Sequence, residues 1–174
     1  TTVSGNAVSY TDKNVKSGAQ YKYTVRACYD KIKSSYKDSN TTVFLTQPTV
    51  KFANASNGIK VSWSKVNGAT GYTVYRSQLT DGKWSSWKNM GTAKSNKSSW
   101  VDKKVTSGVQ YKYTVRACYN SVKSSYTDTK GLLYLAQPTV TVKAVSDGIN
   151  VSWTQSAGAT GYTVYSSEYN AKTK

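Results

Sequence analysis

The sequence predicts an all-β fold built of repeated units, on the strength of three observations. Residues 111–119 (YKYTVRACY) alternate apolar and polar side chains over their full length, which is typical of a half-buried strand. The same nine residues recur at 21–29, 90 positions earlier. Val, Thr, Ser, Tyr and Trp are plentiful, while Leu, Met and Phe are scarce and helix-period runs are absent. This composition favours sheets with an aromatic core.

Further segments repeat with the same period. Residues 47–50 recur at 137–140, 61–63 at 151–153, and 68–75 at 158–165. A period of 90 residues is the size of a whole domain and not of a short solenoid repeat. We therefore expect a tandem array of β-domains: the second half of a unit at 1–47, a complete unit at 48–137, and the first half of a unit at 138–174.

Within the complete unit, turn signals separate seven short segments with strand character. The turns fall at Asn57-Gly58, Asn67-Gly68, Asp81-Gly82 and Ser107-Gly108, where glycine supplies the backbone freedom that a turn needs. Seven alternating strands with frequent turns predict an antiparallel two-sheet sandwich. The expected strands are 49–53, 58–63, 71–77, 87–91, 98–101, 109–119 and 122–135.

Three motifs resemble the fibronectin type III domain: residues 58–63 (GIKVSW), residues 69–75 (ATGYTVY), and the pattern V-x-S-G-x-x-Y-x-Y-x-V-x-A over 105–117. The resemblance covers the whole chain and is closest to tandem domains in secreted or cell-surface proteins of Gram-positive bacteria. It implies an immunoglobulin-like sandwich and a tyrosine corner, in which a hydroxyl bonds to upstream backbone. The core residues it implies are Trp63, Trp153, Tyr72, Tyr162, Tyr21 and Tyr111. The Arg-Gly-Asp loop of some animal members is absent, so integrin binding is not implied.

The two flanking halves are complementary. Half a sandwich leaves its apolar face exposed and is not expected to fold alone. Joining residue 174 to residue 1 of another copy would skip only positions 85–90 of the complete unit. Two explanations stay open: the chain is a window of a longer tandem polypeptide, or separate chains exchange halves and assemble head to tail. Either way, the expected partners are neighbouring units end to end.

The predicted linkers between successive units are very short. Thr46-Gln47-Pro48 connects two strands directly, and proline stiffens the junction because its ring fixes one backbone dihedral. We therefore expect successive units to form a semi-rigid rod.

Catalytic and metal-binding chemistry has few residues to draw on. The chain has no His and one Glu, and its Asp residues read as single side chains in turns or on exposed strands. General acid–base catalysis near neutral pH usually needs a His or paired carboxylates, so we expect no enzymatic activity, no metal and no cofactor. No apolar run of about 20 residues appears, so no membrane span is expected. The chain opens at Thr1 without a signal peptide, which suggests a processed or excised segment.

A candidate ligand surface lies on the outward face of the strands at 71–77 and 109–119. Tyr75 is expected beside Lys112 and Arg116, and Trp84 and Trp87 follow in the next loop. Exposed Trp rings can stack on sugars, and a basic aromatic strip suits acidic polymers. The alternative is that these side chains pair across strands and cover the domain edge, with a purely structural role.

The positive charge is large but dispersed. With 24 Lys and Arg against 8 Asp and Glu, the net charge is +16. Because the cations are spread over all strands and turns and no nucleic-acid motif is present, we expect weak attraction to acidic surface polymers and no specific nucleic acid. Cys28 and Cys118, one per repeat, are expected on the outward side of their strands, too far apart to pair; an intermolecular bridge or a reactive thiol stays open.

The sequence thus favours a non-catalytic spacer module of an extracellular bacterial repeat protein, secreted or at the cell surface. The alternative is an adhesin, or an accessory module that binds carbohydrate or polyanions beside a polysaccharide-acting protein.

Overall fold

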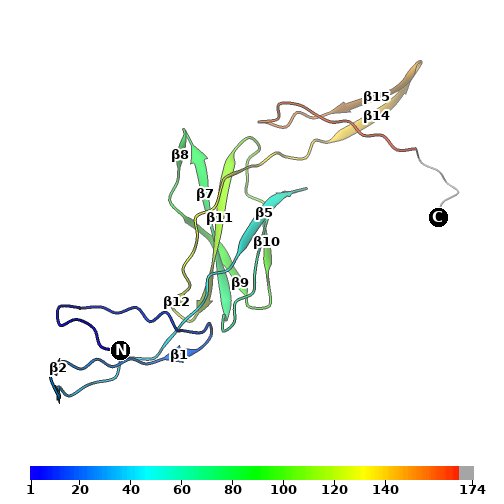
Figure 1. Ribbon diagram of the computed structural model, residues 1–174. Coiled ribbons are helices and arrows are strands. Elements are labelled where there is room, and N and C mark those ends of the chain that lie inside the picture. Colours follow the sequence, from blue (N-terminus) through cyan, green and yellow to red (C-terminus); the bar gives the residue numbers. More distant parts are fainter. Residues whose placement is uncertain (169–174) are drawn as a thin grey trace.

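The structure is a computed structural model that describes residues 1–168 and contains strands but no helix in that range. One compact sandwich forms the middle of an elongated molecule (Figure 1). The N-terminal segment extends from one end of this sandwich and the hairpin of β14 and β15 from the other. The all-β class expected from the alternating pattern is confirmed. The predicted seam at residue 174 lies outside the described residues.

The first sheet of the sandwich has three antiparallel strands. In order they are β10 (Ser99–Asp102), β6 (Gly58–Trp63) and β5 (Val50–Ala55). The central strand, β6, buries Ile59, Val61 and Trp63 and leaves the intervening residues on the other side. This is the period-two pattern of a strand with one face on the core.

The second sheet is organised around two ten-residue strands, β7 (Gly71–Thr80) and β11 (Gln110–Tyr119). Their register runs antiparallel from Gly71 opposite Cys118 to Gln78 opposite Tyr111. β7 also pairs with β9 (Lys88–Lys94) and β8 (Lys83–Trp84), while β11 pairs with β12 (Val122–Lys123) and β13 (Leu132–Leu133). Two antiparallel sheets around one core confirm the predicted sandwich.

The last strand expected for this unit, 122–135, is wrong as a single strand. Only its two ends pair with β11, as β12 and β13, and residues 124–131 between them are irregular. The Ser124 hydroxyl accepts a hydrogen bond from Ala117 N and donates one to Ser125 O. A serine hydroxyl that bonds nearby backbone groups competes with the regular ladder, which explains the interruption.

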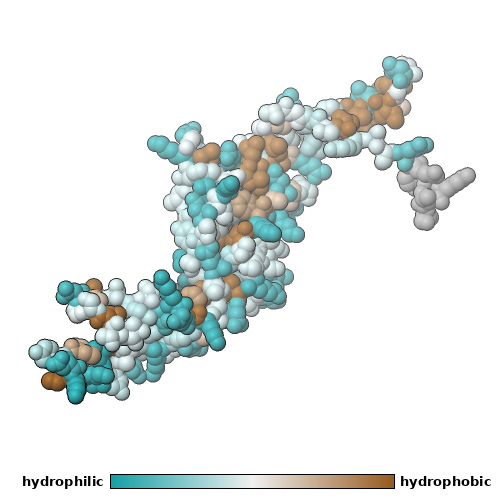
Figure 2. All heavy atoms as spheres, viewed as in Figure 1, coloured by the Kyte–Doolittle hydropathy of each residue, from teal (hydrophilic) through white to brown (hydrophobic). Residues whose placement is uncertain are grey.

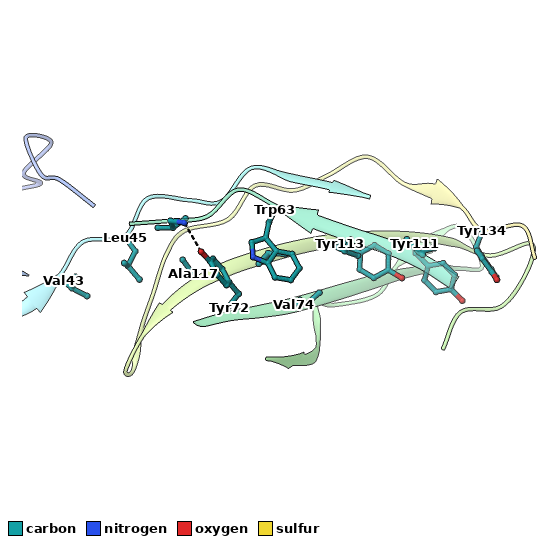
Figure 3. Packing of buried hydrophobic residues seen from close by; sticks show 13 residues of the cluster. Val43, Leu45, Trp63, Tyr72, Val74, Tyr111, Tyr113, Ala117 and Tyr134 are labelled. Atoms are coloured by element: carbon teal, nitrogen blue, oxygen red, sulfur yellow. Dashed lines mark hydrogen bonds between the residues drawn. The ribbon is translucent and has the colours of Figure 1, made fainter. Parts of the chain in front are cut away.

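Aromatic rings fill most of the core (Figure 3). Trp63 and Tyr72 lie 5.5 Å apart between ring centroids, and Tyr113 and Tyr111 continue the row towards Tyr134. Trp63, Tyr72 and Tyr111 are at most 5% exposed. Burial of side chains of this size contributes about 1.5–3 kcal/mol each, so this unit has a core of its own.

Tyrosine hydroxyls tie loops to the core at four places, in two equivalent sets. Thr106 N donates to the Tyr111 hydroxyl over 2.9 Å, and Lys16 N donates to the Tyr21 hydroxyl over 2.8 Å. The other two ties link Val66 N to Tyr72 (the dashed line in Figure 3) and Ser156 N to Tyr162. At Val66, where the bond is buried, an N–H without an acceptor would be costly, so this bond fixes the loop that precedes Tyr72.

The flanking segments hold only short pairings. Residues 1–47 contain β1 (Gln20–Tyr21) with β4 (Thr42–Val43) and β2 (Cys28–Tyr29) with β3 (Ile32–Lys33); the other flank contains β14 (Val140–Val145) with β15 (Gly148–Trp153). Apolar side chains remain in the open on both, as the brown surface of the β14–β15 hairpin shows (Figure 2). Val25 is 86% and Ile149 72% exposed.

The aromatic residues expected in the cores of the flanking units are less covered. Trp153 and Tyr162 are 39% and 40% exposed, and Tyr21 is half-buried. Trp153 and Tyr162 nevertheless keep the geometry of the central pair, with centroids 5.5 Å apart and planes at 50°. Their assignment to a closed core stays a prediction for a completed unit.

Candidate functional site

The predicted outward strip is covered by side chains and is not a bare sheet face. The register places Tyr75 opposite Thr114, and Thr73 opposite Arg116, on neighbouring strands β7 and β11. Thr114 is only 2% exposed, although it belongs to the outward-facing set. Larger side chains from the segments beside the two strands therefore close over it.

Trp84 and Lys112 form a closed cluster at one end of this strip. The Lys112 ammonium lies 4.4 Å from the Trp84 ring centroid and 3.2 Å from the Asp128 carboxylate. The indole also packs on the backbone at Gly131, where an added Cβ would lie 2.8 Å from the ring. Since both residues already have partners within the domain, their arrangement supports the structural reading of this pair.

Trp87, Tyr75 and Arg116 line a separate groove of about 160 Å³ together with Thr114 and Tyr126. The Trp87 and Tyr126 rings meet edge to face, 6.0 Å apart at 79°. The Arg116 guanidinium carbon lies 5.7 Å from the Tyr126 ring centroid. The structure thus divides the five predicted surface residues between the closed cluster and this groove.

Tyr126 is the groove residue that the sequence analysis missed, because it lies in the irregular segment where one continuous strand was expected. A signal for it exists in the repeat. Tyr36 occupies the equivalent position 90 residues earlier, and there the Arg26 guanidinium carbon lies 5.5 Å from the ring centroid. An Arg–Tyr pair retained in two units at the same spacing indicates a fixed stacking contact.

Asp102 corrects the expectation that the Asp residues lie in turns or on exposed strands. It is 1% exposed and lies 2.9 Å from the Arg76 guanidinium in an ion pair. The Tyr113 hydroxyl and Lys104 N also donate to it, each over 2.9 Å. Burial, followed by the charge and hydrogen bond of Asp102, raises the pKa of Tyr113 well above its ordinary value. The Asp102 carboxylate therefore already has its partners within the domain, which supports a structural role.

The remaining chemistry-bearing groups are dispersed. Cys28 and Cys118 are both free thiols; the first is exposed and the second half-buried. Within residues 1–168, no three side chains of His, Cys, Asp or Glu lie close enough together to hold a metal ion. The same range contains no helix that is long and apolar enough to cross a membrane.

A second candidate surface is the joint between residues 1–47 and the central unit, where two turns meet tip to tip. Gly18 and Gly68 are each the third residue of a turn, with φ of 84° and 80°. An added Cβ at Gly68 would overlap the Gly18 Cα. Around this contact, the Ser17 hydroxyl donates to Asn67 O over 2.9 Å, and the Asn67 amide donates to Ser17 O over 3.0 Å.

The same joint recurs at the other end of the central unit. Gly108 and Gly158 have φ of 82° and 83°, and an added Cβ at Gly158 would lie 2.5 Å from the Gly108 Cα. The Ser107 hydroxyl donates to Ala157 O over 2.7 Å. In both joints the serine hydroxyl also accepts a bond from the linker backbone, Thr46 N in the first and Ala136 N in the second. Only glycine permits this backbone approach at a positive φ.

The linker into the central unit is itself held in place. Pro48 is fully buried. The Gln47 side chain bonds to Thr127, and the Ser125 hydroxyl donates to the Gln47 amide oxygen over 3.4 Å. A buried proline beside an anchored glutamine leaves little freedom for bending at this position.

Comparisons with known proteins match parts of this chain. Residues 47–126 match the family model described as "Fibronectin type III domain SaeA third domain". An amylopullulanase from Thermoanaerobacterium saccharolyticum is 32% identical over 98 residues, which is 54% of this chain and 7% of that protein. The matched region is therefore a small part of the relative's length.

Two solved structures are similar to the chain. A Fn3-like protein from Clostridium thermocellum has 22% identity and a TM-score of 0.38, over 55% of this chain and 93% of that one. The chicken CNTN1 FN1-FN3 domains have 18% identity and a TM-score of 0.40, over 79% of this chain and 53% of that one.

Proposed function

We propose that the chain is a non-catalytic spacer module of an extracellular bacterial repeat protein, in which sandwich units stack end to end as a semi-rigid rod. The observation that carries the proposal is the joint that occurs twice with one geometry. Gly18 meets Gly68, and 90 residues later Gly108 meets Gly158. A contact repeated at the period of the sequence gives each unit the same orientation to its neighbour.

The joints resist bending for a physical reason. Backbone meets backbone at the glycine pairs, so no long side chain can rearrange to absorb a rotation. Each joint also holds a serine hydroxyl that donates to a carbonyl of the adjacent unit and accepts from the linker. These bonds lie at exposed or part-buried positions, so each contributes only about 0.5–1.5 kcal/mol.

The exposed apolar faces of the flanks support end-to-end completion by further units. Val25 and Ile149 lie on faces that the central unit covers in its own sandwich. We propose that complementary halves, from a longer polypeptide or from another chain, cover them. Both sources give the same linear assembly.

A second candidate function, an accessory module beside a polysaccharide-acting domain, is favoured by one observation. The similarity to the amylopullulanase is confined to 7% of that protein's length, and we propose that this small stretch is accessory to its catalytic part. The two functions are compatible, because a rod can hold a catalytic domain at a distance from the cell. The same relative motivates the proposed extracellular location.

Solution scattering on tandem copies of residues 48–137 tests the rod. The maximum dimension should grow in proportion to the number of units from two to six copies. A flexible string would instead extend roughly as the square root of that number. Square-root growth with each unit still folded would overturn the spacer proposal.

A further inference from the structure

The groove lined by Tyr75, Trp87, Thr114, Arg116 and Tyr126 has the size of one ring. Its volume is about 160 Å³, which corresponds to roughly five water molecules in the liquid. Pockets for whole small molecules are commonly about 300–1,000 Å³. The groove therefore suits one residue of a polymer that passes over the sheet.

Arg116 brings to this groove a cation that stacks on Tyr126 but has no anionic partner among residues 1–168. Its Nε atom donates to Ser124 O over 2.6 Å, and within residues 1–168 its terminal nitrogens have no hydrogen-bond partner and its guanidinium forms no ion pair. By contrast, Arg76 bonds to Asp102 and Lys104 O. A guanidinium anchored through Nε still offers two parallel N–H donors, the arrangement that binds a carboxylate at both oxygens.

The aromatic side chains that line the groove set a second requirement for its ligand. The Trp87 and Tyr126 rings are nearly perpendicular. Tyr75 lies on β7, directly opposite Thr114 of β11. The negative face of an aromatic ring attracts positively polarised hydrogens, such as the axial C–H groups of a sugar. A nucleobase can also stack on a single aromatic ring, so the rings alone do not distinguish a sugar from a base.

The surrounding charge selects an anionic polymer over a neutral one. Residues 48–137 contain 14 Lys and Arg and 3 Asp, a net charge of +11. Lys123 stands at the edge of the groove, with its ammonium 3.1 Å from the Tyr75 hydroxyl. A surplus of this sign raises the local concentration of polyanions.

We propose that this groove binds an acidic polysaccharide, with one uronate ring against Trp87 and Tyr126 and its carboxylate on Arg116. The inference does not depend on the spacer function, because a rod with or without this groove would be equally stiff. Binding in this groove differs from diffuse charge attraction because it requires one particular arginine, Arg116.

The chain offers a matched control for that arginine. Arg26 also stacks on a tyrosine, Tyr36, but no residue of the 174-residue chain stands 90 positions before Trp87. Arg26→Gln and Arg116→Gln each lower the net charge by one. Binding of the full 174-residue chain to polygalacturonate, measured by affinity gel electrophoresis, should weaken about tenfold or more in R116Q and change less than about twofold in R26Q.

Further variants and polymers complete the test. Arg116→Lys keeps the net charge but loses the paired donors, so it should weaken binding as R116Q does. Trp87→Ala should do the same while its thermal unfolding stays cooperative. Pullulan lacks carboxylates, poly-L-glutamate lacks sugar rings, and oligothymidylate is a nucleic acid; all three should bind at least tenfold more weakly than polygalacturonate.

Four results would overturn the proposal: no binding to polygalacturonate at low salt, equal losses in R26Q and R116Q, full retention of affinity in R116K, or comparable affinity for any of the three other polymers. Each can arise while tandem units remain rigid, so failure here is distinguishable from failure of the spacer proposal.

Discussion

Asp102 is the centre of a buried polar network in the central unit. Its carboxylate accepts from Arg76, Tyr113 and Lys104 N at 2.9 Å each and is 1% exposed. A buried carboxylate is tolerated only when it is paired and hydrogen-bonded. The sequence shows only that Asp102 precedes the tyrosine corner at Tyr111. It did not indicate Arg76, which comes from the opposite sheet.

Replacing Asp102 by Asn should destabilise the protein strongly. The variant removes the negative charge and leaves the Arg76 guanidinium, 13% exposed, without its counter-ion. Breaking a buried pair in this way costs about 3–5 kcal/mol. Asp128→Asn is the matched control, because Asp128 is 65% exposed in its pair with Lys112 and should cost under about 1 kcal/mol. Urea unfolding of both variants measures the difference, and equal losses would contradict this role of Asp102.

The raised pKa of Tyr113 predicts a loss of stability at alkaline pH. Burial keeps the folded-state phenol protonated, while the unfolded-state phenol ionises near pH 10. The contribution of Tyr113 is therefore fully present below about pH 10 and is lost as pH rises above that value. The free energy of unfolding of the wild type should fall more steeply between pH 10 and 11 than that of Tyr113→Phe. Parallel curves would show that Tyr113 titrates alike in both states.

Most strands could be predicted because their sequences alternate and their turns carry glycine. Residues 111, 113, 115 and 117 were expected on one face, and all four are buried in β11. The additional hairpin of β7 and β8 was missed, although its turn was identified. Asp81 and Gly82 both adopt positive φ, 50° and 72°, which is the conformation that lets a two-residue turn reverse the chain.

The groove was only partly predictable, for a reason that lies in the elements. Tyr75 and Arg116 belong to the regular strands β7 and β11, so alternation alone placed them on one face. Tyr126 belongs to the irregular segment between β12 and β13, where side-chain-to-backbone bonds replace the ladder. No periodicity can place a residue in such a segment, and only the repeated Arg–Tyr spacing indicates its partner.

At the scale of the whole molecule, two turns of the central unit, at 67–68 and 107–108, decide how the flanking segments are oriented. The sequence predicted turns at Asn67-Gly68 and Ser107-Gly108, but it did not predict that each would meet a turn of the adjacent unit. Contacts between separate units leave no local pattern, since either turn would form without the other. The joint was therefore visible only once the backbones were placed together.

The most direct test of a fixed joint is the distance between equivalent cysteines in neighbouring units. A two-unit tandem of residues 48–137 carries one Cys118 per unit, which can be spin-labelled for pulsed dipolar measurement. We expect one narrow distance distribution for the wild type, and a broad one when Gly68→Ala is placed in the second unit. Gly82→Ala is the control, because Gly82 also has positive φ but has no neighbour within 4 Å of an added Cβ. A broad wild-type distribution, or the same width in both variants, would contradict the account.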